Sequence, residues 1–150
     1  MQQSFTINLV SWQNETDNLR SIREIVFINE QNVPEEMEWD EFDAISKHVL
    51  ALDNDRKPIG TARLLPNRRI GRMAVLREWR GKGVGSAMLK KLLQELMRQN
   101  VTRAILNAQT SVIQFYQKFG FQTEGEEFIE AGIPHIKMVL ILKQTNLSCS

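Results

Sequence analysis

The sequence contains little cysteine, no excess charge of either sign and no long apolar run. Its single cysteine, Cys149, excludes a disulfide framework within the chain. The 19 basic and 18 acidic residues leave a formal net charge of +1, whereas a non-specific nucleic-acid binder usually has a strong basic excess. No apolar run approaches the roughly 20 residues that span a bilayer. We therefore expect neither a nucleic-acid partner nor a membrane partner.

What remains fits a single globular domain over residues 1–150, ending in a polar tail of about residues 144–150. A hydrophobic content of 42% is enough for one packed core in 150 residues. The first residues, MQQSFTINLVSW, lack the charged region and the long apolar region of a signal peptide. Together with the low cysteine content, this predicts a cytoplasmic protein.

Hydrophobic periodicity predicts an α/β fold with a single mixed, mostly antiparallel central sheet flanked by helices. Alternating or β-branched runs predict strands, and apolar residues at helical spacing, such as Leu19, Ile22, Val26 and Phe27, predict helices. Pro34 is expected to end the first helix. The segment PEEMEWDEFDA that follows is predicted to be an acidic, aromatic loop. The predicted strands are 5–10, 47–53, 58–65, 70–76, 103–108, 121–128 and 135–142, and the predicted helices are 16–31, 83–99 and 112–119.

A glycine-rich turn, RGKGVG, lies between the predicted strand 70–76 and the predicted helix 83–99. A Walker-type phosphate loop requires Ser or Thr directly after its lysine, but Gly83 follows Lys82. A dinucleotide-binding turn, G-x-G-x-x-G, would place glycine where Met88 stands. Both motifs also belong near the first strand of a parallel sheet, so neither fits.

The remaining pattern is R-x-x-G-x-G, from Arg80 to Gly85. Without side chains, successive backbone N–H groups can converge on one anion, and the helix dipole adds its positive end. Arg77, Arg80 and Lys82 add positive charge that suits a diphosphate. The turn could instead be only a glycine-rich entry to a packed helix, with Arg80 and Lys82 in solvent. The motif alone leaves both interpretations open.

A second motif supports the first interpretation. The segment QTSVIQFYQKFGF, Gln109 to Phe121, resembles the N-x-x-A-x-x-F-Y-x-K-x-G-F segment of the GNAT superfamily of acyl-CoA-dependent N-acyltransferases. The turn R-x-x-G-x-G after a strand resembles the coenzyme A pyrophosphate loop of the same superfamily. The predicted order of elements fits as well, so the resemblance covers about residues 5–142. Within the superfamily, VFINEQNVPEEMEWDEFDA and FIEAGIPHIKM resemble a bacterial subgroup whose substrates are mostly unassigned.

The resemblance implies acetyl-CoA as cosubstrate and transfer to an amine by direct attack in a ternary complex. No metal is expected, because no ligand spacing with His or Cys accompanies the acidic segment. Tyr116 would be the general acid that protonates the departing sulfur, while Phe115 and Phe121 would pack the core. Gln109 stands where the superfamily often has Asn and would contact the coenzyme. The backbone of strand 70–76 would hold the pantetheine arm, and the turn would hold the pyrophosphate. The residues implied for coenzyme binding are Met73, Ala74, Val75, Arg80, Gly81, Lys82, Gly83, Val84, Gly85, Ser86 and Gln109.

The acceptor side is less defined, because strand 70–76 lacks the glutamate that many members use as general base. The acidic segment could attract a cationic amine or simply be a solvated loop. Arg72, like Arg63, could bind an anionic group or face solvent, and His135 is a candidate base or a satisfied strand histidine. The candidate acceptor-site residues are Asp40, Glu41, Asp43, Arg72 and His135. A non-catalytic coenzyme A sensor with the same fold remains the alternative function, and a homodimer is one open assembly state.

Overall fold

The computed structural model describes residues 4–142. The predicted polar tail and Cys149 lie outside these residues. The chain divides into two compact units, Met1–Leu92 and Leu93–Ser150, which are described one at a time. The prediction of a single domain over residues 1–150 stays a prediction.

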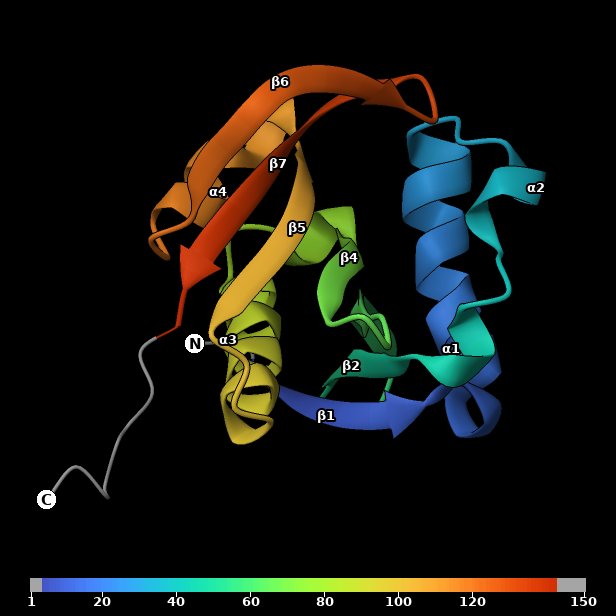
Figure 1. Cartoon of the computed structure of the whole chain (residues 1–150). Helices are drawn as coiled ribbons and strands as arrows, with labels where there is room; N and C mark the ends of the chain where they lie inside the picture. The colour runs from blue at the N-terminus through green and yellow to red at the C-terminus, as the bar shows by residue number, and fades with distance from the viewer. Residues whose placement is uncertain (1–3, 143–150) are drawn as a thin grey trace, which may run out of the picture. The chain divides into compact units, whose positions relative to one another are not determined.

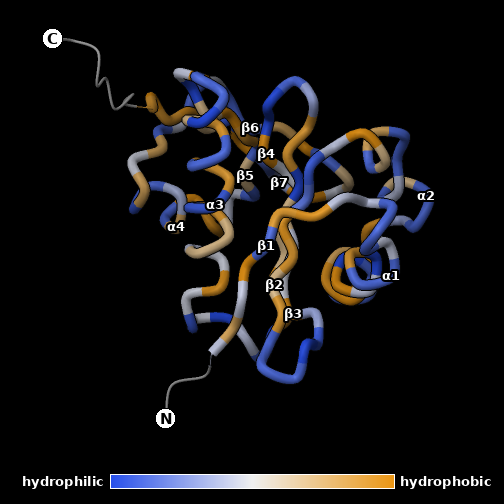
Figure 2. Tube along the Cα trace, turned by 90° about the horizontal axis from the view of Figure 1, so that it is seen from below, coloured by the Kyte–Doolittle hydropathy of each residue, from blue (hydrophilic) through white to orange (hydrophobic). Residues whose placement is uncertain are grey.

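The first unit contains four antiparallel strands in the order β1-β2-β3-β4 (Figure 1). Their bounds are β1 Phe5–Ser11, β2 Lys47–Asp53, β3 Pro58–Leu64 and β4 Arg69–Val75. Figure 2 shows hydrophobic residues along β2 and β3 and hydrophilic residues in the turn that joins them. The predicted strands therefore occur, with ends that differ by one residue at most.

Helix α1, Trp12–Arg23, packs against these strands and continues as a π-helical segment, Glu24–Glu30. The Ser11 side chain caps the first turn by accepting a hydrogen bond from the Asn14 N–H. Glu15 has non-helical dihedral angles (φ −128°, ψ 24°), so the regular helix resumes at residue 16, where the sequence predicted its start. The helical part ends at Glu30, before the predicted end at residue 31. The π-helical geometry has no signature in the sequence.

The predicted acidic loop is partly helical. It contains the short helix α2, Glu35–Glu38, and a 3₁₀ turn, Asp43–Ile45. The prediction of a loop throughout this segment was therefore wrong. Glu38 and Asp43 each belong to one of these turns, and both are buried.

Strand β4 contains a bulge that the sequence did not predict. Thr61 of β3 pairs with Ala74, and Arg63 pairs with Gly71, so Arg72 and Met73 together oppose one residue, Ala62. Arg72 has a positive φ of 49°, which is unusual for a residue with a side chain. A bulge redirects the side chains around it. Here it directs Arg72 toward the segment 37–40.

Helix α3, Val84–Arg98, follows a 3₁₀ turn, Arg77–Trp79, and the glycine-rich turn. The first part of the helix packs closely on β3. A Cβ atom at Gly60 would lie 3.1 Å from Val84 and 3.2 Å from Met88, so the close approach depends on glycine at this position. The helix ends near Asn100, which has a φ of 62° and is the residue predicted to stop it.

In the second unit, β7 pairs antiparallel with both β5 and β6 (Figure 1). The elements are β5 Arg103–Gln109, a 3₁₀ turn Thr110–Val112, α4 Ile113–Gln117, β6 Gln122–Glu130 and β7 Ile133–Ile141. The helix α4 is shorter than the predicted 112–119, because the chain turns through Gly120 at a φ of 99°. The register of β6 shifts between Glu124 and Phe128, where Gly125 has a φ of 84°.

Candidate functional site

The glycine-rich turn has the geometry of an open anion cradle. Gly81 and Gly83 have positive φ angles of 76° and 90°, and both are exposed. A Cβ atom at either position would meet nothing within 4 Å, so the space above the turn is open. Positive φ at alternate residues aims successive N–H groups toward one side. The turn leads directly into the N-terminus of α3, where the N–H groups of Val84, Gly85 and Ser86 are the first of the helix.

The Arg80 side chain lies along this turn and is bound within the protein. Its two terminal nitrogens donate to both Glu30 carboxylate oxygens at 2.7 and 2.8 Å, and its Nε donates to the Val75 carbonyl at 2.9 Å. The hydrogen bonds from Arg80 lower the pKa of Glu30 and reciprocally raise the pKa of Arg80. Arg77 lies 3.8 Å from the same carboxylate, and Lys82 lies over the Trp79 ring at 5.7 Å. The turn is therefore tied to the end of the π-helical segment and to the end of β4.

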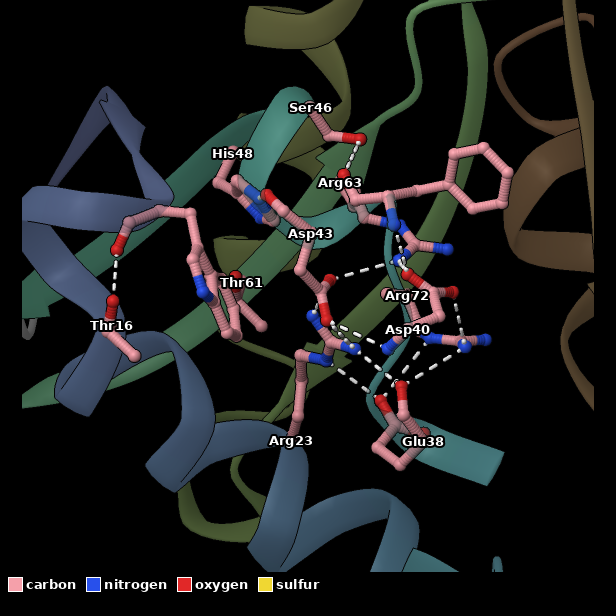
Figure 3. A network of polar contacts seen from close by, with 12 residues as sticks. Thr16, Arg23, Glu38, Asp40, Asp43, Ser46, His48, Thr61, Arg63 and Arg72 are labelled. Carbon is pink, nitrogen blue, oxygen red and sulfur yellow. Dashed lines mark hydrogen bonds and ion pairs between the residues drawn. The ribbon is translucent and has the colours of Figure 1, made fainter. Parts of the chain in front are cut away.

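Three acidic residues of segment 34–46, Glu38, Asp40 and Asp43, form a largely buried network with three arginines (Figure 3). At its centre, Arg23 of α1 is fully buried. Its Nε donates to Glu38 at 2.7 Å and one terminal nitrogen donates to Asp43 at 2.7 Å. A solvated loop was one interpretation of this segment, and it is wrong for Glu38 and Asp43, because both are buried. Glu41, in contrast, is exposed.

Two further arginines complete the network. Arg63 of β3 donates to Asp40 at 2.7 Å and to Asp43 at 2.9 Å. Arg72 lies 3.3 Å from Glu38 and 3.3 Å from Asp40. Three guanidinium groups thus face three carboxylates, and only the Asp40 carboxylate, at 28% exposure, reaches the solvent appreciably.

The environment shifts the pKa values of this network in different directions. Burial raises the pKa of Glu38, although Arg72 and Arg23 oppose the shift. Burial also works against ionisation of Asp43, but hydrogen bonds and charge from Arg23 outweigh it and lower its pKa. Burial lowers the pKa of His48, whose Nε2 donates to the Asp43 carbonyl at 2.8 Å. His48 is therefore a neutral, structural histidine at physiological pH.

In the second unit, Tyr116 of α4 is a buried phenol. Its ring contacts Phe115 (5.0 Å between centroids) and Phe121 (5.8 Å), both edge-on. Phe121 itself is part of the core, as its predicted packing role requires. Burial raises the pKa of Tyr116 to about 12. The hydroxyl is therefore protonated throughout the physiological range.

The remaining two candidates of the second unit lie opposite each other. Gln109 ends β5 and pairs with His135 of β7. His135 is 8% exposed, and its Nδ1 lies 2.7 Å from the Ile133 carbonyl oxygen.

The arrangement provides no metal site within residues 4–142, where no group of three His, Cys, Asp or Glu side chains is placed to hold an ion. In the same residues, no helix is long and apolar enough to cross a membrane.

Comparison with known proteins places the chain in a family. The family described as "Acetyltransferase (GNAT) domain" matches residues 16–142. The uncharacterized N-acetyltransferase YjcF of Bacillus subtilis is 40% identical over 122 residues, which cover 79% of this chain and 86% of YjcF. The chain therefore belongs to the GNAT acetyltransferase family. This family is a class of acyltransferases that use a coenzyme A donor.

Solved structures agree with this assignment. An acyl-CoA N-acyltransferase from Pseudomonas aeruginosa is 30% identical with a TM-score of 0.80, covering 91% of this chain and 99% of that one. ElaA of Escherichia coli is 29% identical with a TM-score of 0.79 at the same coverages of 91% and 99%. These matches confirm the predicted fold class, an α/β fold with a mixed, mostly antiparallel sheet flanked by helices.

Two residues of the site were not predicted as part of it, Arg23 and Glu30. Both lie at helical spacing with Leu19, Ile22 and Val26, but only Arg23 is buried. A charged side chain on an apolar face signals a buried ion pair, and this signal was available for Arg23. The partners of the two residues, Glu38 for Arg23 and Arg80 for Glu30, are distant in the sequence, and no local pattern identifies them.

Proposed function

We propose that this protein is an N-acetyltransferase that transfers the acetyl group of acetyl-CoA to a primary amine by direct attack in a ternary complex. The observation that carries the donor assignment is the exposed turn with positive φ at Gly81 and Gly83, directly before the N-terminus of α3. Such a turn suits a diphosphate, because backbone N–H groups and the helix dipole act on the same anion. The backbone of Arg80 to Ser86 holds the pyrophosphate, and the backbone of Met73 to Val75 holds the pantetheine arm.

The chemistry needs a general acid at the departing sulfur, and Tyr116 takes this role. Burial keeps the phenol protonated, since its pKa is about 12. The same shift makes Tyr116 a weaker acid than an ordinary thiol, whose pKa is about 8.5. Complete transfer to a free thiolate is therefore uphill. Tyr116 acts by hydrogen bonding to the sulfur while the carbon–sulfur bond breaks, when negative charge develops there.

The donor assignment is tested by thermal unfolding. Acetyl-CoA should stabilise the fold by about 2.7 kcal/mol at a hundredfold excess over its dissociation constant. Adenosine, which has no diphosphate, should stabilise it much less. A melting curve that does not change with saturating acetyl-CoA would refute the assignment.

The reaction is tested by free-thiol release from acetyl-CoA with a panel of primary amines that includes spermidine, tyramine, glycinamide and a lysine-containing peptide. We expect at least one amine to accelerate release above the rate of hydrolysis. Stabilisation by acetyl-CoA without thiol release for any amine would support the coenzyme A-binding sensor instead. The amine identity, cytoplasmic location and homodimer remain predictions.

A further inference from the structure

The hydrogen bonding of His135 determines which of its ring nitrogens is basic. Nδ1 lies 2.7 Å from the Ile133 carbonyl oxygen. A carbonyl oxygen only accepts hydrogen bonds, so Nδ1 must carry the proton in the neutral ring. The lone pair of the neutral imidazole is then on Nε2. A histidine oriented in this way by its Nδ1 proton is prepared to accept a proton at Nε2.

The ring is also held in place while Nε2 has no internal partner. Phe128 of β6 stacks on His135, with ring centroids 5.9 Å apart and planes 23° from parallel. Within residues 4–142, Nε2 forms no hydrogen bond, and it is not among the polar side-chain atoms that are sealed from solvent without a partner. His48 is the opposite case. Its Nε2 donates to a carbonyl and its unprotonated Nδ1 is sealed, so His48 has no accessible basic nitrogen.

The strand register places His135 at the end of the sheet that leads to Tyr116. His135 pairs with Gln109, the last residue of β5. From Gln109 the chain continues through the turn Thr110–Val112 into α4, which carries Tyr116. The candidate proton acceptor and the candidate proton donor thus belong to the same end of the β5–β7 pair.

The titratable groups nearest His135 in strand register are on β7 and β6, and among them Glu126 and Glu127 are exposed carboxylates in the bulge before Phe128. Lys137, two residues along β7, binds Glu124 of β6 at 2.8 Å. Glu130 lies opposite Ile133, two pairs beyond His135, and Gln109 is uncharged. In the first unit, the carboxylates of the buried network form ion pairs with arginines. Of the two histidines, both of which the structure describes, His135 is therefore the one that combines an oriented lone pair with no internal partner.

We propose that His135 is the general base that takes the proton of the acceptor amine through Nε2. This rests on the proposed acetyl transfer. As the amine nitrogen bonds to the thioester carbonyl carbon, its proton passes to Nε2. The carbon–sulfur bond then breaks while the Tyr116 hydroxyl donates a hydrogen bond to the sulfur. The imidazolium releases its proton through water to the thiolate, so His135 returns to its neutral form and the products are the acetylated amine and free coenzyme A.

The test uses the amine with the fastest thiol release in the panel and compares pH profiles of kcat/KM. In the wild type, kcat/KM should have an acidic limb, because a general base must be unprotonated to act. His135→Gln should lower kcat/KM by about 10²- to 10⁴-fold and lose the acidic limb that His135 causes. Its acetyl-CoA affinity should stay at the wild-type value. Glu130→Gln, which removes a neighbouring titratable group, is the matched control and should keep both rate and profile.

A second variant separates a chemical role from a packing role. His135→Ala should regain part of its activity when imidazole is added, because the free base can replace the missing ring, whereas a variant impaired only by poor packing should not. An unchanged rate in His135→Gln, or a lower rate with the wild-type pH profile, would overturn the assignment while leaving the proposed acetyl transfer intact. Failure of the wild type to release thiol with any amine would overturn both.

Discussion

Arg80 and Glu30, which are 50 residues apart in the sequence, form a bidentate ion pair with N–O distances of 2.7 and 2.8 Å. Arg80 is the first residue of the glycine-rich turn, and Glu30 is the last residue of the π-helical segment. The pair positions the guanidinium beside the turn and at the same time offsets its charge. A diphosphate that binds the turn therefore meets an arginine whose charge is already partly balanced.

Replacing Glu30 should consequently strengthen donor binding. Glu30→Gln keeps an oxygen that accepts a hydrogen bond from Arg80 but removes one negative charge beside the turn. We expect the dissociation constant of acetyl-CoA to fall by about two- to fivefold at low ionic strength, and the gain to fade in about 1 M salt, where the Debye length is about 3 Å. Calorimetric titrations at both salt concentrations measure this.

The control is Glu24→Gln, at the start of the same segment, because Glu24 forms no ion pair within residues 4–142. It should leave the affinity unchanged. Weaker binding by Glu30→Gln would show that holding Arg80 in place matters more than the charge that Glu30 adds.

Substitution of Gly83 tests whether the open space over the turn is a binding site. Gly83→Ala places a methyl group there and adopts a φ of 90° that L-residues resist, at a cost of about 1 kcal/mol in stability. Acetyl-CoA should bind at least about tenfold more weakly, equivalent to 1.4 kcal/mol. Binding and unfolding are measured on the same samples.

Gly125→Ala provides a matched control for the strain alone. Gly125 has a similar φ of 84° and equally open surroundings, but it lies in the bulge of β6. We expect a comparable loss of stability with no change in acetyl-CoA affinity. Equal affinities for both variants would mean that the turn is only an entry to α3.

Tyr116 is the only tyrosine in the sequence, so its ionisation can be followed directly by the ultraviolet absorbance of tyrosinate. In the folded protein the midpoint should lie near pH 12, and in denaturant it should lie near the ordinary value of 10.0. Because folding raises this pKa, the phenol adds stability that is present below pH 10 and is lost as the pH rises toward 12. The loss should amount to about 2.7 kcal/mol, at 1.36 kcal/mol per unit.

Tyr116→Phe distinguishes a proton donor from a core ring. It should lower kcat by about 10²- to 10⁴-fold while acetyl-CoA affinity stays nearly constant, because the proton is needed in the transition state and not in ground-state binding. It should also abolish the alkaline loss of stability. Wild-type turnover across the pH range would remove Tyr116 from the mechanism.

Asp43 and Glu38 should respond to pH in opposite ways. Asp43→Asn leaves Arg23 and Arg63 short of a charge and should cost about 3 kcal/mol at pH 7. The folded protein lowers the pKa of Asp43, so its ionised form stabilises the fold above the ordinary value of 3.8 and loses this contribution as the pH falls. The cost of Asp43→Asn should therefore shrink under acidic conditions.

Glu38 has a raised pKa, so its stabilising contribution is present below its ordinary value of 4.5 and is lost as the pH rises. The cost of Glu38→Gln should then decrease from pH 4 to pH 7. Chemical denaturation of both variants and the wild type at several pH values gives the slopes. Slopes of the same sign would contradict the two assigned shifts.

The sequence was sufficient to place most strands and the long helix, because their signals are local. Lys47–Asp53 forms a strand with the predicted bounds, and α3 begins and ends within one residue of its prediction. The glycine turn and the motif around Tyr116 were identifiable for the same reason, since each is a short run of neighbouring residues.

Features that depend on distant partners were not predicted. Arg23 is paired with residues 15 and 20 positions away, and these contacts bury Glu38 and Asp43 in a segment for which a solvated loop was one interpretation. The positive φ of Arg72 follows from the bulge between β3 and β4, since nothing in the residue type favours it. Tertiary pairing, rather than local preference, determines both.

The balance of charge in the network of Arg23, Arg63 and Arg72 has a consequence for encounter rates. Seven acidic residues lie in segment 34–43 or at Glu30, and they suggest a surface that attracts cations from a distance. The three carboxylates of Glu38, Asp40 and Asp43 face three guanidinium groups, so their fields largely cancel beyond a few ångströms. Long-range attraction raises association rates only where a net field survives. The network itself should thus add little to the rate at which a cationic amine arrives, and little to the dependence of that rate on ionic strength.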